Sequence, residues 1–89
     1  KVLAARDGVV IYEGDLRNYG RLILLSHASD NSILTVYSNI KNPRVALHQK
    51  VKKGDTLALV ASDKNNNSTL YFEIRYKGQA VNPLNYLED

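Results

Sequence analysis

A strictly alternating stretch lies near the end of the chain: Ser68-Thr69-Leu70-Tyr71-Phe72-Glu73-Ile74-Arg75-Tyr76-Lys77-Gly78. Successive side chains of a β-strand point to opposite faces of the sheet, so this pattern predicts a strand with one apolar and one polar face. The apolar face, which we expect to build core, carries Leu70, Phe72 and Ile74. The polar face, which either lines a groove or meets solvent, carries Thr69, Tyr71, Glu73 and Arg75.

A second alternating stretch, residues 33–40, predicts another strand with one polar face. Its polar face carries Thr35, Tyr37 and Asn39, opposite Leu34 and Val36. We expect Tyr37 and Asn39 to project toward the same side as Thr69 and Tyr71. Exposed tyrosines are good anchors for a peptide, a sugar or a protein, although a tyrosine that only covers the sheet edge fits the same pattern.

The remaining segments predict short strands separated by turns. Residues 9–12 form a β-branched and aromatic run, and residues 21–26 form an apolar run that we expect to be covered on both faces. The polar residues 13–20 contain two glycines and predict a loop, and the turn Lys53-Gly54-Asp55 predicts a hairpin. Residues 84–87 predict at most one helical turn. Strands at this spacing predict an all-β sandwich or barrel.

The composition indicates one small globular domain. The chain has 89 residues, of which 44% are hydrophobic and 24% are charged, and no apolar run approaches the roughly 20 residues that cross a bilayer. There is no cysteine, which excludes disulfides and thiolate zinc sites. The net charge of +3 is too diffuse for a nucleic-acid binder, although it favours an acidic partner. Because the chain begins at Lys1, we expect a C-terminal fragment of a longer protein.

Several motifs follow one another over nearly the whole chain: Asp7-Gly8-Val9-Val10, Tyr19-Gly20, His27, Val36-Tyr37, Val51-Lys52-Lys53-Gly54, Leu70-Tyr71-Phe72-Glu73-Ile74-Arg75 and Val81-Asn82-Pro83. In this order, they resemble the LytM/lysostaphin family of zinc endopeptidases. The resemblance implies a single LytM-like domain over residues 1–89. It also implies a small β-sandwich with an open groove on one sheet, which in the family holds a peptidoglycan peptide.

Three departures from the family pattern bear on catalysis. The His-Leu-His segment of active members corresponds to Thr69-Leu70-Tyr71, and a further catalytic histidine corresponds to Asn39. The family's upstream His/Asp motif would precede Lys1. A neutral phenol is a poor zinc ligand, because its pKa near ~10 keeps it protonated at neutral pH. Amide and hydroxyl side chains do not exchange protons near pH 7, so we predict no metal, no cofactor and no enzymatic activity.

Other residues of the predicted groove have both a functional and a structural interpretation. Glu73 and Arg75 either contact a partner or are solvated charges two residues apart on one strand face. His27 follows a buried strand and is a candidate for the groove face. A single histidine without partners at ligand spacing is more often structural than a metal ligand.

Family members that have lost the zinc and catalytic residues resemble the EnvC- and NlpD-type factors of Gram-negative bacteria. By analogy, the resemblance implies a periplasmic or cell-envelope domain that binds and activates a peptidoglycan amidase or another cell-wall hydrolase during division. The partner surface would comprise Asn39, Thr69 and Tyr71 with the groove-face residues His27, Tyr37, Glu73 and Arg75.

Three alternatives stay open at this point. The domain could bind peptidoglycan directly, or it could be a zinc endopeptidase completed by residues upstream of Lys1. The third alternative is a lipoyl-type carrier, because residues 51–64 resemble the carrier hairpin with Lys64 as the attachment point. Against this alternative, Ala61 replaces the usual glutamate, and the residues after Lys64 end in an Asn-Pro tail.

Overall fold

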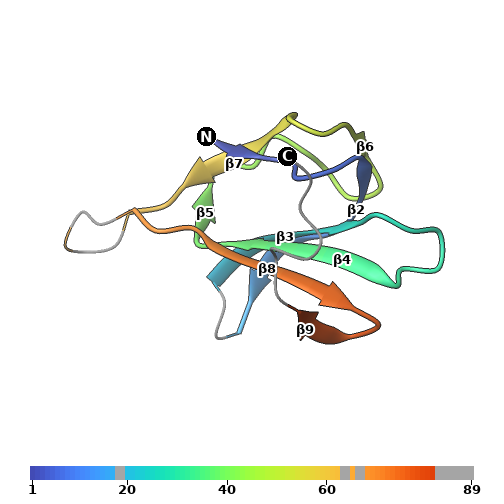
Figure 1. The fold of residues 1–89 in the computed structure, drawn as a ribbon. Coiled ribbons are helices and arrows are strands. Elements are labelled where there is room, and N and C mark those ends of the chain that lie inside the picture. Colours follow the sequence, from blue (N-terminus) through green and yellow to red (C-terminus); the bar gives the residue numbers. More distant parts are fainter. Residues whose placement is uncertain (18–19, 63–64, 66–67, 82–89) are drawn as a thin grey trace.

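The computed structural model describes residues 1–17, 20–62, 65 and 68–81, and in these ranges every regular element is a β-strand (Figure 1). The strands are β1 (Val2–Leu3), β2 (Gly8–Leu16), β3 (Gly20–Ser26), β4 (Ile33–Ser38), β5 (Ile40–Lys41), β6 (Lys50–Val51), β7 (Thr56–Val60), β8 (Tyr71–Tyr76) and β9 (Gln79–Val81). None of the described segments is a helix long and apolar enough to cross a membrane. The predicted helical turn at 84–87 and Lys64 lie outside the described residues.

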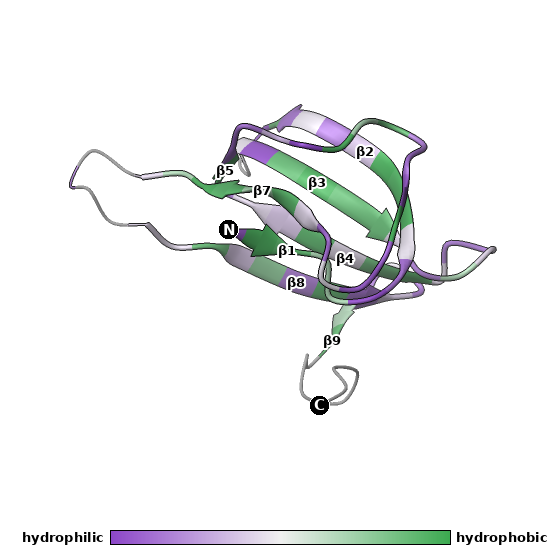
Figure 2. Cartoon of the chain, turned by 90° about the horizontal axis from the view of Figure 1, so that it is seen from above, coloured by the Kyte–Doolittle hydropathy of each residue, from purple (hydrophilic) through white to green (hydrophobic). Residues whose placement is uncertain are grey.

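Two antiparallel sheets form the domain. The larger sheet has the strand order β6-β2-β3-β4-β8-β9, and the smaller has the order β1-β7-β5. The smaller sheet lies over one face of the larger one (Figures 1 and 2). The prediction of an all-β domain built from two sheets is therefore confirmed.

The hydrophobic core lies between the two sheets. Strands of both sheets contribute side chains that are almost fully buried, and the aromatic rings of Tyr37 and Phe72 meet there at 5.4 Å between centroids. Figure 2 shows β3 as hydrophobic along most of its length, although the smaller sheet covers only one face of the larger sheet. The buried cluster comprises Val2, Ala4, Val10, Ile23, Leu25, Tyr37, Ile40, Val45, Val51, Leu57 and Ala58.

Two predicted local structures are wrong. The sequence predicts a loop over residues 13–20, yet residues 13–16 continue β2 and Gly20 begins β3. The regular ladder between β2 and β3 outweighs the poor strand propensity of Gly14 and Asp15. The turn at Lys53-Gly54-Asp55 does not join a hairpin, because β6 pairs with β2 whereas β7 pairs with β1 and β5. This turn instead carries the chain from the larger sheet to the smaller one.

The strand register determines which side chains share a face of the larger sheet. Residues directly opposite each other in an antiparallel pair project to the same face. Tyr37 lies opposite Phe72 and Thr35 lies opposite Ile74, and these four face the smaller sheet. The opposite face carries the pairs Leu34–Arg75, Val36–Glu73 and Ser38–Tyr71.

Candidate binding groove

The face of the larger sheet that points away from the smaller sheet is named the groove face. It contains a depression of about 300 Å³ with an apolar floor and a polar edge on β8. At the centre of the floor, Leu22 and Val36 are 1% and 3% exposed, so they offer a closely packed surface and no deep cavity. The depression is lined by Leu16, Leu22, Leu24, Leu34, Val36, Glu73 and Arg75.

The polar edge of the groove face is organised around the Glu73 carboxylate. One oxygen of this carboxylate accepts a hydrogen bond from the Tyr71 hydroxyl, and the other accepts one from Arg75 Nε. The three residues are two apart in sequence, so the strand places them on one face. Arg75 Nη1 also donates to the Gly78 carbonyl at 3.2 Å. Glu73 therefore fixes an aromatic ring and a guanidinium side by side, and Tyr71 remains 46% exposed.

Asn39 and Thr69 meet where β4 and β8 leave the ladder. The Asn39 amide nitrogen donates to the Thr69 carbonyl at 2.6 Å and lies 3.4 Å from the Ala61 carbonyl. Asn39 has φ = 64°, a left-handed conformation that asparagine tolerates better than most residues. This turn ends the alternation of β4 and carries the Asn39 side chain toward the segment that precedes β8. Together with Tyr71, which lies opposite Ser38, the three positions gather at one end of the sheet.

Tyr37 does not lie on the groove face, which corrects the expectation from the sequence. Its side chain is 1% exposed and packs in the core, and burial raises the pKa of its hydroxyl. The hydroxyl accepts a hydrogen bond from the Ala5 backbone N–H at 3.0 Å and lies 2.9 Å from Thr35 Oγ1. The sequence alternation identified the two faces of β4 correctly but assigned the core to the wrong one. The side with Thr35 and Tyr37 is the core side, and the side with Leu34 and Val36 is the groove side.

His27 is also absent from the groove face. It lies at the other end of the sheet, where Nδ1 is 2.7 Å from the Asp7 carbonyl and Nε2 is 2.7 Å from Thr35 Oγ1. The carbonyl only accepts, so Nδ1 donates to it and, in the neutral ring, Nε2 accepts from the Thr35 hydroxyl. Desolvation by burial lowers the pKa of His27, and the positive charge of Arg6 adds to this effect. Both ring nitrogens form hydrogen bonds within the fold, which favours the structural interpretation of His27 over a role in the groove.

The sequence did not identify the apolar floor of the groove as part of a binding site. Leu34 and Val36 were visible as the apolar half of an alternating strand and were expected in the core. The signal that could have separated the two faces was volume, because the larger Tyr37 fills the space opposite Phe72 between the sheets. Among the residues that the structure describes, no three His, Cys, Asp or Glu side chains gather as metal ligands would.

The fold and site define a class: a two-sheet β-domain with an open groove, at one end of which amide, hydroxyl and phenol groups lie close together. The sequence pattern of Peptidase family M23 matches residues 1–83. The chain belongs to this family.

Relatives with similar sequences carry the names of a murein hydrolase activator and of a lipoprotein. The chain is 42% identical over 87 residues to the Murein hydrolase activator NlpD of Escherichia coli (strain K12), which covers 97% of this chain and 22% of that protein. It therefore spans less than a quarter of the length of that relative. It is 39% identical to the Lipoprotein NlpD of Yersinia enterocolitica, covering 97% of this chain and 88% of that sequence.

Solved structures share the fold. The catalytic domain of lysostaphin from Staphylococcus simulans superposes with a TM-score of 0.82 at 20% identity, covering 99% of this chain and 70% of that one. A chain in the crystal structure of the SpoIIIAH and SpoIIQ complex superposes with a TM-score of 0.77 at 26% identity, covering 91% of this chain and 57% of that one. The first likeness establishes the β-architecture alone.

Proposed function

We propose that this domain does not cut peptidoglycan but promotes its hydrolysis, by binding a cell-wall amidase in the periplasm during division and activating it. The observation that carries the proposal is the hydrogen bonding of Asn39, Thr69 and Tyr71, the residues that the resemblance matches to the family's catalytic positions. The Asn39 amide is bonded to the Thr69 carbonyl, and the Tyr71 hydroxyl is bonded to Glu73. Side chains that catalyse in active members are replaced here by groups that hold the groove together.

The chemistry of Tyr71 supports the absence of catalysis. To bind Zn²⁺, a phenol would have to lose its proton, and the ordinary pKa of a phenol is about 10. The Tyr71 hydroxyl donates a hydrogen bond to the neighbouring Glu73 carboxylate, so a metal ion at this position would have to displace that bond. Neither Asn39 nor Thr69 offers a group that titrates near neutral pH, so general acid–base catalysis has no agent at these positions.

The same arrangement supports binding. Tyrosine and arginine are enriched among the residues that dominate protein–protein affinity, and Glu73 holds Tyr71 and Arg75 in fixed positions beside an apolar floor. A preorganised surface of this kind loses little conformational entropy on binding. The names of the relatives, a murein hydrolase activator and a lipoprotein, support a regulator in the cell envelope.

The test is reconstitution with an envelope amidase and dye-labelled sacculi, comparing dye release with and without the 89-residue chain. We expect the chain alone to release no dye, with or without added zinc, and to increase release by the amidase. Tyr71→Ala and Arg75→Ala each remove one anchor of the groove face, so each should weaken amidase binding by roughly tenfold. Arg21→Ala is the matched control, because Arg21 also pairs with a glutamate, Glu13, but on the β2–β3 hairpin outside the groove.

Two results would contradict the proposal. Zinc-dependent release of wall peptides by the purified chain would make it an enzyme. The chain would be a peptidoglycan-binding module if it were retained on amidase-free sacculi, if Tyr71→Ala abolished this retention, and if the chain did not bind the amidase.

A further inference from the structure

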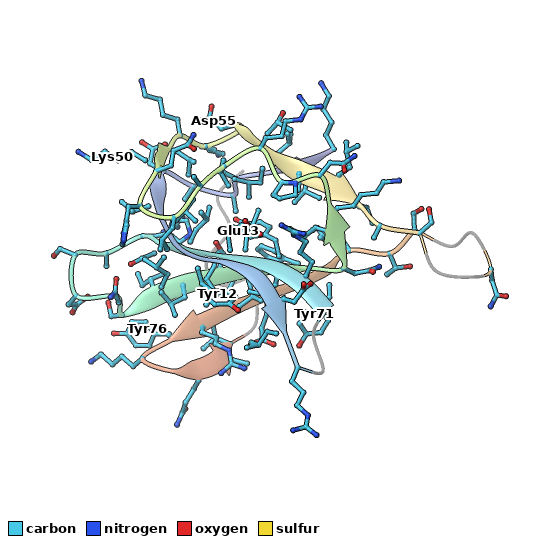
Figure 3. All side chains as sticks on the ribbon, turned by 180° about the vertical axis from the view of Figure 1, so that it is seen from behind. Tyr12, Glu13, Lys50, Asp55, Tyr71 and Tyr76 are labelled. Carbon is cyan, nitrogen blue, oxygen red and sulfur yellow. The ribbon has the colours of Figure 1, made fainter. Side chains whose placement is uncertain are left out.

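A second hollow lies at the opposite end of the larger sheet from Tyr71, where β2 begins and β3 ends. Its volume is about 580 Å³, within the size range of ligand sites. Its lining is mainly apolar and includes Val9, Ile11 and Val51, with His27, Lys50 and Lys52. Figure 3 shows Lys50 and Tyr71 on opposite sides of the molecule. We name it the basic hollow, after Lys50 and Lys52 in its lining.

The charges around the basic hollow are predominantly positive. The exposed Lys50 and Lys52 form no ion pair with any residue that the structure describes. Arg6 and Lys53 line an adjoining depression beside His27. Two carboxylates lie near these cations, and both accept backbone hydrogen bonds: Asp7 from the Lys53 N–H at 2.7 Å, and Asp55 from the Lys52 N–H at 2.8 Å. Four cations therefore surround apolar walls, and the nearby carboxylates are engaged in holding the turn.

We propose that the basic hollow binds an acidic peptide segment of a partner protein. An aliphatic side chain of the peptide lies against Val9 and Ile11, and carboxylates on either side of it pair with Lys50 and Lys52. This binding site shares no lining residue with the groove depression and lies at the other end of the larger sheet from Tyr71, and the inference stands whether or not the groove binds an amidase.

The walls favour a peptide over the other anions that lysines attract. A phosphate or a phosphorylated ligand is typically held by a helix N-terminus or by the fork of an arginine. The described part of the chain contains no helix, and Arg6 lines the adjoining depression and not the hollow itself. A membrane surface requires apolar side chains that protrude, whereas Val9 is half-buried and Val51 is 4% exposed in a concave wall. His27 has both ring nitrogens engaged, so it contributes a wall and no metal ligand.

The test uses ¹⁵N-labelled protein and three synthetic peptides followed by two-dimensional NMR. The probe is acetyl-Glu-Asp-Leu-Asp-Glu-amide, with a counterpart in which the acids are replaced by amides and another in which serine replaces leucine. We expect the probe to shift the backbone amides of Gly8, Val9 and Val51 in a saturable way that weakens as salt increases. The amide peptide should cause no shift, and the serine peptide should bind several-fold more weakly.

Two charge-matched double variants locate the site. Lys50→Gln with Lys52→Gln should weaken binding of the probe by about fivefold, as expected for the loss of two solvent-exposed ion pairs. Lys1→Gln with Lys41→Gln removes the same net charge elsewhere and should leave binding unchanged. The proposal would be overturned if both double variants weakened probe binding equally, if the serine peptide bound as tightly as the probe, or if millimolar probe caused no localised shift. It would also be overturned if inorganic phosphate shifted the same amides. The last contrary result would be Lys50-dependent sedimentation with phosphatidylglycerol vesicles in the absence of probe binding.

Discussion

Replacing Tyr37 with phenylalanine tests whether this residue belongs to the core or to a binding surface. The Tyr37 hydroxyl joins the Ala5 backbone N–H to Thr35 and, through Thr35, to His27. The phenylalanine ring would occupy the same space against Phe72, so the substitution removes one oxygen and leaves the packing intact.

The expected cost follows mainly from the one group that loses its partner. The Ala5 N–H is left without an acceptor, whereas the Thr35 hydroxyl keeps its bond to His27 Nε2, and a buried polar group without a partner costs about 1–3 kcal/mol. Little cavity cost is added, because no carbon is removed. We expect a loss of about 2 kcal/mol in the free energy of unfolding. For a domain of this size, that corresponds to a fall of roughly 10 °C in Tm.

Urea and thermal unfolding followed by circular dichroism measure the effect. Tyr76→Phe is the matched control, because Tyr76 is 38% exposed and its hydroxyl lies outside the core, so this variant should change stability by less than about 0.5 kcal/mol. Amidase activation should be the same in both variants when they are assayed well below their Tm. If Tyr37→Phe unfolds like the wild type, the hydrogen-bonded chain does not stabilise the fold. If it abolishes activation while remaining folded, the core assignment of Tyr37 is wrong.

Three further predictions concern the two ends of the larger sheet. Burial lowers the pKa of His27 in the folded state, so the unfolded chain binds more protons than the folded chain in mild acid. The free energy of unfolding should therefore fall as the pH decreases from 7 through the pKa of the unfolded state, near ~6.5, toward pH 5. His27→Gln should flatten this dependence in urea titrations. An unchanged slope in His27→Gln would refute the assignment of this pH dependence to His27. Gly8→Ala would place a Cβ 2.6 Å from the Ser26 carbonyl oxygen, so it should lower the free energy of unfolding in urea by more than about 2 kcal/mol. An unchanged free energy of unfolding would refute this close approach. Asn39→Gly should be about 1 kcal/mol more stable than Asn39→Ala because φ is 64°, and equal unfolding midpoints would contradict the left-handed turn.

The sequence predicted the strands but not which face of each strand is buried. Alternation placed Leu70, Phe72 and Ile74 against the core correctly, because β8 has a purely apolar side. On β4 both sides are buried, and the side with two hydroxyl groups, Thr35 and Tyr37, is the one between the sheets. The Tyr37 hydroxyl is satisfied from a distant position, as its separation of 32 positions from Ala5 shows. No local pattern contains that information.

The same limit explains how the site was only partly predictable. The resemblance to zinc endopeptidases grouped Asn39, Thr69 and Tyr71, and the structure brings these three together at one end of the sheet. It could not show that Asn39 reaches Thr69 through a left-handed turn, or that Glu73 joins Tyr71 to Arg75. These bonds depend on how strand ends and side chains meet after the sheet has formed.

The bonds at the groove also bear on how a zinc site can be lost without loss of the fold. An imidazole cluster at the end of a sheet is held in place partly by its metal, so its removal leaves strand ends without a cross-link. Here the Asn39 amide connects the end of β4 to the segment before β8, and the Tyr71–Glu73–Arg75 row fixes the edge of the groove. These bonds hold the strand ends and the edge of the groove in place. A groove held in this way is a preorganised surface, and this property supports the binding role proposed for the domain.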